Sequence, residues 1–216
     1  MKKLIKISAN LITLFRIFLV FFMLPFLFLK HKNLNSNDVD HRINFSIIFI
    51  LASITDFLDG YIAKKFKTQT IFGKFFDPIA DKLLVIVSFF YIYTLCNKGS
   101  NYKLFNDNNN NKTIGNLILI ALLTNIIRDF VVMGLRLIAV EQKKIITASI
   151  LGKLKTIFTF CSILLILFSK QIGKIIIQED QIINLIKCCL IINIILIIYS
   201  GSNYIIKNFK FIQKSF

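Results

Sequence analysis

Residues 43–63 read INFSIIFILASITDFLDGYIA, an apolar run that carries aspartates near its end. A membrane-spanning helix needs about 20 predominantly apolar residues, because each residue advances the helix by about 1.5 Å across a hydrocarbon core about 30 Å thick. Further runs of this kind cover residues 7–29, 79–96, 114–140, 147–168 and 182–206. The sequence therefore predicts an all-α integral membrane protein with six transmembrane helices.

The composition of the whole chain agrees with a membrane-embedded protein. Of its 216 residues, 56% are hydrophobic and only 18% are charged, which is more apolar surface than a soluble core of this size could bury. The polar stretches 31–42 and 106–111 between the runs are expected to be exposed loops. The composition does not change along the chain and shows no long linker, which predicts one domain over residues 1–216.

The basic residues predict how the chain is oriented in the membrane. The formal net charge is +16, but the lysines are scattered beside the apolar runs rather than gathered on one soluble face, so we expect no nucleic-acid partner and a lipid bilayer instead. With an even number of spans, the two termini and the 2–3 and 4–5 loops share one side. Their lysines assign that side to the cytoplasm by the positive-inside rule.

Four aspartates lie within or beside these runs: Asp56, Asp59, Asp77 and Asp81. A charged side chain near the centre of a membrane helix costs at least about 2.5–3.5 kcal/mol, so such residues mark functional sites by default. If the second helix enters from outside near Ile43, Asp56 lies about 20 Å along it. That depth predicts an active site at the cytoplasmic side.

Helical periodicity groups small residues with the first two acids. Asp56, Asp59, Gly60 and Ala63 fall within an arc of roughly 100° on one helix face. A bulky ligand could lie against this face, because two of the four positions have almost no side chain.

The other two acids share a face of the next helix. Asp77 and Asp81 are four residues apart, and Pro78 predicts that Asp77 caps a helix whose first residue is the proline. Four carboxylates at one membrane level repel one another unless cations neutralise them. Oxygen ligands suit Mg²⁺ or Mn²⁺, and two such ions can clamp the attacking and leaving oxygens of a phosphoryl displacement.

The stretch reads DFLDGYIAK at 56–64, then eight residues, then GKFFDPIAD at 73–81. It resembles the signature of the CDP-alcohol phosphatidyltransferase family, with every gap kept. Lys64 stands where the signature has arginine, which keeps the charge but loses the planar fork for phosphate. The resemblance implies an enzyme that joins an alcohol to the phosphatidyl group of CDP-diacylglycerol and releases CMP.

The resemblance also implies roles for individual residues. Asp56, Asp59, Asp77 and Asp81 would hold two divalent cations, Mg²⁺ or Mn²⁺, and Asp81 would in addition be the general base. The residues implied in binding CDP-diacylglycerol are Thr13, Arg16, Gly60, Ala63, Lys64 and Gly73. Arg16 needs an anionic partner, either an aspartate or the diphosphate of the substrate, whereas ordinary bonding between helices remains an alternative for Thr13.

A second group of charges interrupts the fourth and fifth runs, and its members are Arg128, Asp129, Arg136, Lys153 and Lys155. In one interpretation Asp129 pairs with Arg136, seven residues on, and the lysines reach toward the membrane surface. In the other, the cations bind an anionic co-substrate, since arginine forks recognise phosphate well.

The sequence around these charges is RDF at 128–130, GLR at 134–136 and ASILGKLKT at 148–156. It resembles the bacterial phosphatidylglycerophosphate synthases, although those enzymes more often have Arg-Glu where this chain has Arg-Asp. The resemblance implies glycerol 3-phosphate as acceptor, bound through Arg128, Arg136, Lys153 and Lys155. It also implies a homodimer in the bacterial inner membrane, while residues from 182 onward add only hydrophobicity.

Two alternatives stay open. The same chemistry could use another acceptor, such as serine, inositol phosphate or phosphatidylglycerol. A divalent-cation transporter could use aspartates to bind the transported ion, but transporters of that kind usually have paired, Gly/Pro-broken helices and sites near the bilayer midplane. The sequence favours the transferase, because its aspartates lie near one membrane surface.

Overall fold

The protein's structure is a computed structural model, and it describes residues 2–28, 37–66, 71–97, 104–105, 107–141, 150–175 and 179–213. Inside these helices, the side chains outside the description are those of residues 2–10, 37–40, 56–66, 71–75, 140–141, 174–175, 179 and 209–213. All regular structure in the described residues is helical, as predicted. The chain forms two compact units, Met1–Tyr102 and Lys103–Phe216.

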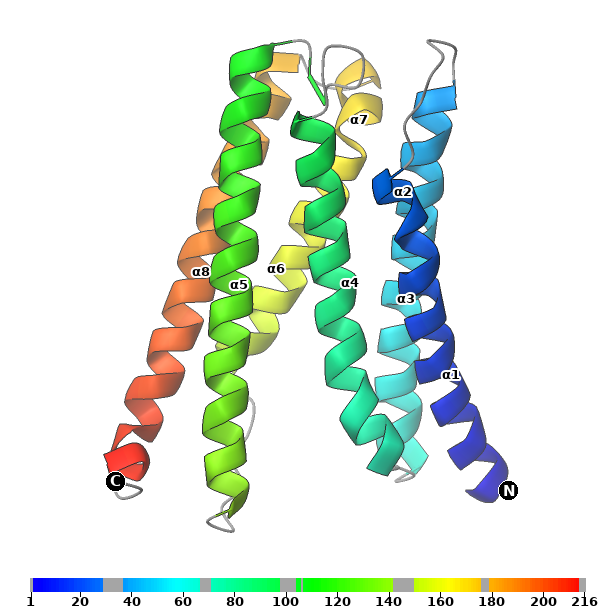
Figure 1. The fold of residues 1–216 in the computed structure, drawn as a ribbon, viewed down its shortest axis with the longest axis vertical. Helices are drawn as coiled ribbons and strands as arrows, with labels where there is room; N and C mark the ends of the chain where they lie inside the picture. Colours follow the sequence, from blue (N-terminus) through cyan, green and yellow to red (C-terminus); the bar gives the residue numbers. More distant parts are fainter. Residues whose placement is uncertain are drawn as a thin grey trace. The chain divides into compact units, whose positions relative to one another are not determined.

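The first unit contains α1 (Lys2–Met23), α2 (Pro25–Phe28), α3 (Asn37–Phe66) and α4 (Ile71–Asn97), shown from blue to green in Figure 1. Helix α1 packs against both α3 and α4. Pro25 follows its last turn, where a residue without an N–H donor interrupts the helix. Buried residues of α1 recur every three or four positions and so lie on one face: Thr13, Arg16, Val20 and Met23.

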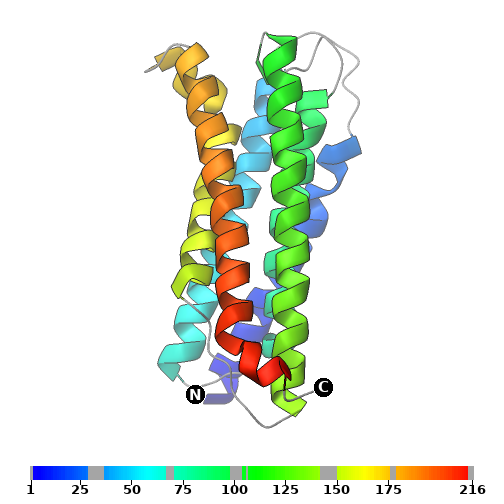
Figure 2. The ribbon, with the colours of Figure 1, turned by 90° about the vertical axis from the view of Figure 1, so that its left-hand side faces the viewer.

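The second unit contains α5 (Asn108–Glu141), α6 (Ile150–Leu167), α7 (Ser169–Ile175) and α8 (Glu179–Gln213). Helix α8 packs against both α5 and α6. Figures 1 and 2 both show α5 and α8 running in the same direction, with α6 running back between them in the chain. This arrangement makes α8 the element that joins the unit.

The buried face of α8 alternates in steps of four and three residues, the spacing of one helix seam. Its members are Ile186, Leu190, Asn193, Ile197, Ser200 and Tyr204. The seam is apolar at Ile186 and Leu190, and from Asn193 onward it brings an amide, a hydroxyl and a phenol into the interior of the unit.

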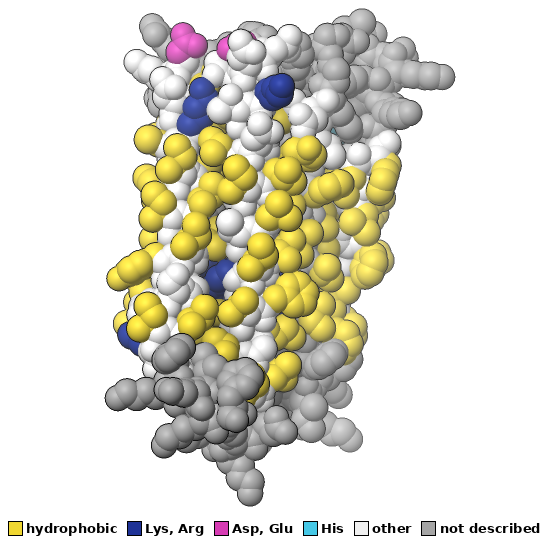
Figure 3. Space-filling view, turned by 60° about the vertical axis from the view of Figure 1, so that its left-hand side comes forward, with side chains coloured by type: hydrophobic (Ala, Val, Ile, Leu, Met, Phe, Trp, Pro, Cys, Tyr) yellow, Lys and Arg dark blue, Asp and Glu magenta, His cyan; other side chains and the backbone are white. Residues whose placement is uncertain are grey.

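The outward surfaces of the helices are apolar over membrane-spanning lengths. Among the described residues, the stretches long and apolar enough to cross a membrane are Leu11–Phe28, Phe76–Asn97, Asn108–Ala139, Ile150–Leu167 and Asp180–Asn208. Figure 3 shows such a face on the side of α5 and α8, where hydrophobic side chains form a broad band and acidic side chains lie near one end. The chain is therefore a multi-pass membrane protein with five spans in the described residues. The expected sixth lies on α3, whose described apolar part is the shorter His41–Thr55.

Helix ends differ most from the sequence-based expectation. Helix α4 begins at Ile71, so Pro78 lies inside it and Asp77 does not cap it. The predicted cap was wrong because residues 71–76 continue the helix toward its N-terminus. Residues 37–42, expected in a loop, belong to α3.

Residues 108–111 of the asparagine-rich stretch were also wrongly predicted to be a loop, since α5 begins at Asn108, whereas residue 106 lies outside the described residues. Asp107 caps the helix: its Oδ1 accepts a hydrogen bond from the Asn109 backbone N–H at 2.9 Å. The buried Asn111 amide then ties the preceding chain to the helix, because its Oδ1 accepts from the Phe105 N–H (3.0 Å) and its Nδ2 donates to the Phe105 carbonyl (2.6 Å). A side-chain cap and an amide clasp thus start the helix where composition alone suggests a loop.

We expect Asn111→Ala to lower the thermal unfolding temperature of the detergent-solubilised protein, because the change leaves buried groups of Phe105 without partners. Each unsatisfied buried group costs about 1–3 kcal/mol. The matched control is Asn109→Ala, since Asn109 is exposed and takes part only through its backbone. Equal unfolding temperatures for the two variants would contradict the clasp.

Candidate functional site

The structure places two of the four predicted metal ligands in detail. Asp77 and Asp81 lie one turn apart on α4, and both side chains are partly exposed. Asp56 and Asp59 lie on α3, but their side chains are outside the described residues. The same is true of four residues predicted to bind CDP-diacylglycerol, namely Gly60, Ala63, Lys64 and Gly73.

Helix α1 reaches the first of these carboxylates through a buried threonine. The Thr13 hydroxyl donates a hydrogen bond to Asp77 Oδ1 at 2.8 Å. Thr13 is almost fully buried, so the hydroxyl has little freedom to turn away. The contact is a hydrogen bond between helices, and it restrains the rotation of the Asp77 carboxylate.

One turn further along, α1 reaches the second carboxylate. Arg16 Nη1 donates to Asp81 Oδ1 at 3.0 Å, and the arginine side chain is 0% exposed whereas that of Asp81 is 45% exposed. Of the two anions expected for Arg16, the structure shows an aspartate. The pair joins a buried cation to a carboxylate that a ligand can reach.

The two described carboxylates have the chemistry of ligands for a divalent cation, although the described residues contain no group of three acidic, histidine or cysteine side chains that could hold an ion. Carboxylate oxygens are the ligands that Mg²⁺ and Mn²⁺ prefer, and Asp77 and Asp81 present theirs on one face of α4. Groups that orient a metal's ligands raise its affinity. Thr13 and Arg16 are placed to do this for the two carboxylates.

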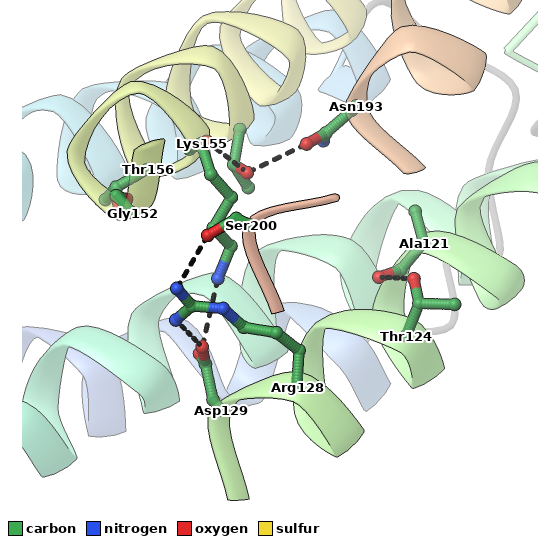
Figure 4. A network of polar contacts seen from close by, with 10 residues as sticks. Ala121, Thr124, Arg128, Asp129, Gly152, Lys155, Thr156, Asn193 and Ser200 are labelled. Carbon is green, nitrogen blue, oxygen red and sulfur yellow. Dashed lines mark hydrogen bonds and ion pairs between the residues drawn. The ribbon is translucent and has the colours of Figure 1, made fainter. Parts of the chain in front are cut away.

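The second unit holds a separate charged cluster, formed by Arg128, Asp129 and Lys155 (Figure 4). Asp129 Oδ1 accepts hydrogen bonds from Arg128 Nη1 at 2.9 Å and from Lys155 Nζ at 3.1 Å. The three side chains are 14%, 18% and 6% exposed, in that order. One carboxylate against two cations leaves a net positive charge in a mostly buried place.

Helix α8 completes the surroundings of Arg128. The Arg128 Nη2 donates to the Ser200 hydroxyl at 2.8 Å, as Figure 4 shows. A β-carbon at the next residue, Gly201, would lie 3.0 Å from Arg128 Cγ. The expectation that this last apolar run adds only hydrophobicity was therefore wrong.

The other two predicted phosphate ligands lie apart from this cluster. Arg136 is exposed, and its Nε reaches the Tyr204 hydroxyl only at 3.4 Å. It lies eight residues beyond Arg128, or about 12 Å along the helix axis. Lys153 is exposed on α6.

Asp129 pairs with Arg128 and Lys155, so the suggested pairing of Asp129 with Arg136 is not the one that forms. Lys155 is buried on Asp129 rather than extended toward the membrane surface. Sequence reasoning missed Ser200 and Tyr204. A usable signal was their spacing of four residues within an apolar helix.

The described helices are apolar over membrane-spanning lengths, α4 carries two aspartates one turn apart, and Arg128 and Lys155 form a mostly buried cationic cluster. A family model described as CDP-alcohol phosphatidyltransferase matches residues 6–201. The chain belongs to this family.

Several bacterial relatives carry the same name, CDP-diacylglycerol–glycerol-3-phosphate 3-phosphatidyltransferase. The one from Rickettsia bellii is 38% identical over 79% of this chain and 80% of its own length. The one from Bacillus subtilis is 30% identical over 70% and 68%. The one from Rickettsia typhi is 41% identical over 60% of this chain, and the match spans only 63% of that relative, less than two thirds of its length.

We expect Thr13→Val to weaken Mn²⁺ binding by chelator-treated protein about 10-fold or more, because groups that orient a metal's ligands typically contribute about 10–100-fold in affinity. Valine keeps the shape and removes the hydroxyl that donates to Asp77. The control is Thr94→Val, whose hydroxyl donates to the Tyr91 carbonyl of its own helix. Calorimetric titration measures the affinity, and identical values for both variants would contradict the role of Thr13.

Proposed function

We propose that the chain transfers the phosphatidyl group of CDP-diacylglycerol to glycerol 3-phosphate, giving phosphatidylglycerol phosphate and CMP in phospholipid biosynthesis. The relatives carry this activity in their names. The observation from this chain that supports it best is the cluster of Arg128 and Lys155 around a single carboxylate oxygen. Serine or a neutral polyol would not need such a cationic site.

The first unit supplies the nucleotide-lipid and metal functions. Asp56, Asp59, Asp77 and Asp81 would hold two divalent cations, Mg²⁺ or Mn²⁺, which neutralise charge on the diphosphate when bound. Gly60, Ala63 and Gly73, which have almost no side chain, would leave room for the CDP group. Binding of CDP-diacylglycerol would also involve Lys64, and it would involve Thr13 and Arg16 through the carboxylates that these two residues orient.

Asp81 is the residue that we assign as general base. The acceptor hydroxyl loses its proton to the Asp81 carboxylate, and its oxygen forms a bond to the phosphorus that carries diacylglycerol. The bond from that phosphorus to the oxygen of CMP breaks, and CMP leaves with the electron pair. Asp81 suits this role because its side chain is partly exposed and Arg16 holds its Oδ1 in place.

The second unit supplies the acceptor site. Arg128 and Lys155 form its centre, since both already donate to one anionic oxygen. Arg136 and Lys153 are further cations on α5 and α6 that would strengthen attraction for a phosphate dianion. The family match extends over both units, which supports one functional domain in spite of the two compact units.

The relatives are bacterial, so we place the protein in the inner membrane with both termini and the active site at the cytoplasmic side. The lysine distribution supports this orientation. The family resemblance supports a homodimer. The sixth span would be α3, extended beyond its described apolar part.

The test is an assay of purified protein with labelled CDP-diacylglycerol and each of four acceptors: glycerol 3-phosphate, serine, inositol phosphate and phosphatidylglycerol. We expect CMP release and a new lipid with glycerol 3-phosphate, because the cationic cluster matches its phosphate. The reaction should stop in excess chelator. Turnover with only another acceptor would replace glycerol 3-phosphate, and lack of CMP release with every acceptor would contradict the transferase.

A further inference from the structure

Arg128 is held on both nitrogens of its fork. Its Nη1 donates to Asp129 Oδ1 and its Nη2 to Ser200 Oγ, at 2.9 and 2.8 Å. Its Nε is buried and has no hydrogen-bond partner among the described residues. An unsatisfied buried donor is unfavourable. The guanidinium keeps this orientation in spite of the unpaired Nε, so the hydrogen bonds to Asp129 and Ser200 hold it there.

The stem of Arg128 lies unusually close to the backbone of α8. A β-carbon on Gly201 would be 3.0 Å from Arg128 Cγ and 3.8 Å from its Cβ. At the shorter distance the arginine would have to give way by a few tenths of an ångström. Cγ lies near the backbone end of the side chain, so its shift would change the path of the stem and strain the hydrogen bonds of the guanidinium with Asp129 and Ser200.

The second cation of the cluster is tied to the same helix. Lys155 begins a turn of α6 that ends at Thr159, and the Thr159 hydroxyl lies 2.8 Å from the Lys155 carbonyl oxygen and 3.0 Å from Asn193 Oδ1. Asn193 and Ser200 are seven residues apart and so lie on one face of α8. One face of α8 therefore binds α6 one turn from Lys155, through Asn193, and binds the Arg128 side chain directly, through Ser200.

We propose that Asp129, Ser200 and Gly201 are positioning residues of the acceptor-phosphate site, acting through Arg128 and Lys155. The inference rests on the proposed function. Asp129 holds the two cations together against their mutual repulsion, Ser200 fixes the direction of the fork, and Gly201 leaves space for the stem. Ordering these long side chains before the substrate arrives removes a cost that binding would otherwise carry.

The test of Ser200 uses a neighbouring serine as control. Ser200→Ala removes the tether to Nη2, whereas Ser202→Ala removes an exposed hydroxyl on the same helix. We expect KM for glycerol 3-phosphate to rise about 3- to 10-fold in Ser200→Ala, the effect of losing one hydrogen bond. KM for CDP-diacylglycerol and kcat should stay within about 2-fold of the parent, and Ser202→Ala should match the parent throughout.

The test of Gly201 uses as control a glycine at which an added β-carbon has room. Gly201→Ala should raise KM for glycerol 3-phosphate by a similar factor while its unfolding temperature stays at or above that of the parent, because alanine favours a helix over glycine. In Gly173→Ala the new β-carbon would be 3.9 Å from Ile182 Cδ1, an ordinary contact. This control should leave both KM values unchanged.

Removing the charge of Asp129 distinguishes two roles of this residue, because they change KM for glycerol 3-phosphate in opposite directions. If Asp129 positions the cations, Asp129→Asn raises KM for glycerol 3-phosphate; if its carboxylate instead competes with the substrate phosphate, the same change lowers KM and overturns the proposal. Equal rises of both KM values in Ser200→Ala and Gly201→Ala would also overturn it, because a purely structural role acts on both substrates. A parent protein that shows no transfer to glycerol 3-phosphate contradicts the proposed function, whereas an active parent with unaltered variants contradicts only the positioning role.

Discussion

Arg16 and Lys155 are buried charged residues of the described helices, and each meets a carboxylate from another helix because the apolar surroundings give it no water. Arg16 is the clearest case, since its fully buried side chain meets Asp81 from α4. In the second unit, Oδ1 of Asp129 accepts hydrogen bonds both from Lys155 of α6 and from Arg128 of its own helix. These pairings decide which helix faces can pack together.

The pairings also fix the register between helices. Thr13 and Arg16 are three residues apart on α1, and their partners Asp77 and Asp81 are four apart on α4. A slide of one turn would leave Arg16 buried without this carboxylate. Buried ion pairs are weak contributors to net stability but strongly penalise a broken partner, so here they specify one arrangement rather than add strength. In the proposed function, the same groups would orient the ligands of a metal and of a phosphate, so that packing and chemistry would share one set of residues.

Sequence patterns predicted the five membrane-spanning helices of the described residues, because hydrophobic length is a local property. These patterns did not predict which residues the charged side chains would pair with. Asp129 pairs with Lys155, 26 residues away, and Arg128 with Ser200, 72 residues away, and such choices depend on how helices rotate against one another. Helix starts failed for a related reason: the cap at Asp107 and the continuation of α4 before Pro78 depend on a few specific contacts that composition does not reveal.

In the proposed site the Arg128 fork recognises the acceptor phosphate, and the steady-state kinetics of Arg128→Lys, with each substrate varied separately, test this role. Lysine keeps the charge but cannot bind both Asp129 and Ser200 in the fork geometry. We expect KM for glycerol 3-phosphate to rise about 10- to 100-fold, the scale of one lost charge-assisted hydrogen bond, and KM for CDP-diacylglycerol to stay unchanged. A rise in KM for CDP-diacylglycerol alone would contradict this role and assign Arg128 to the nucleotide-lipid site.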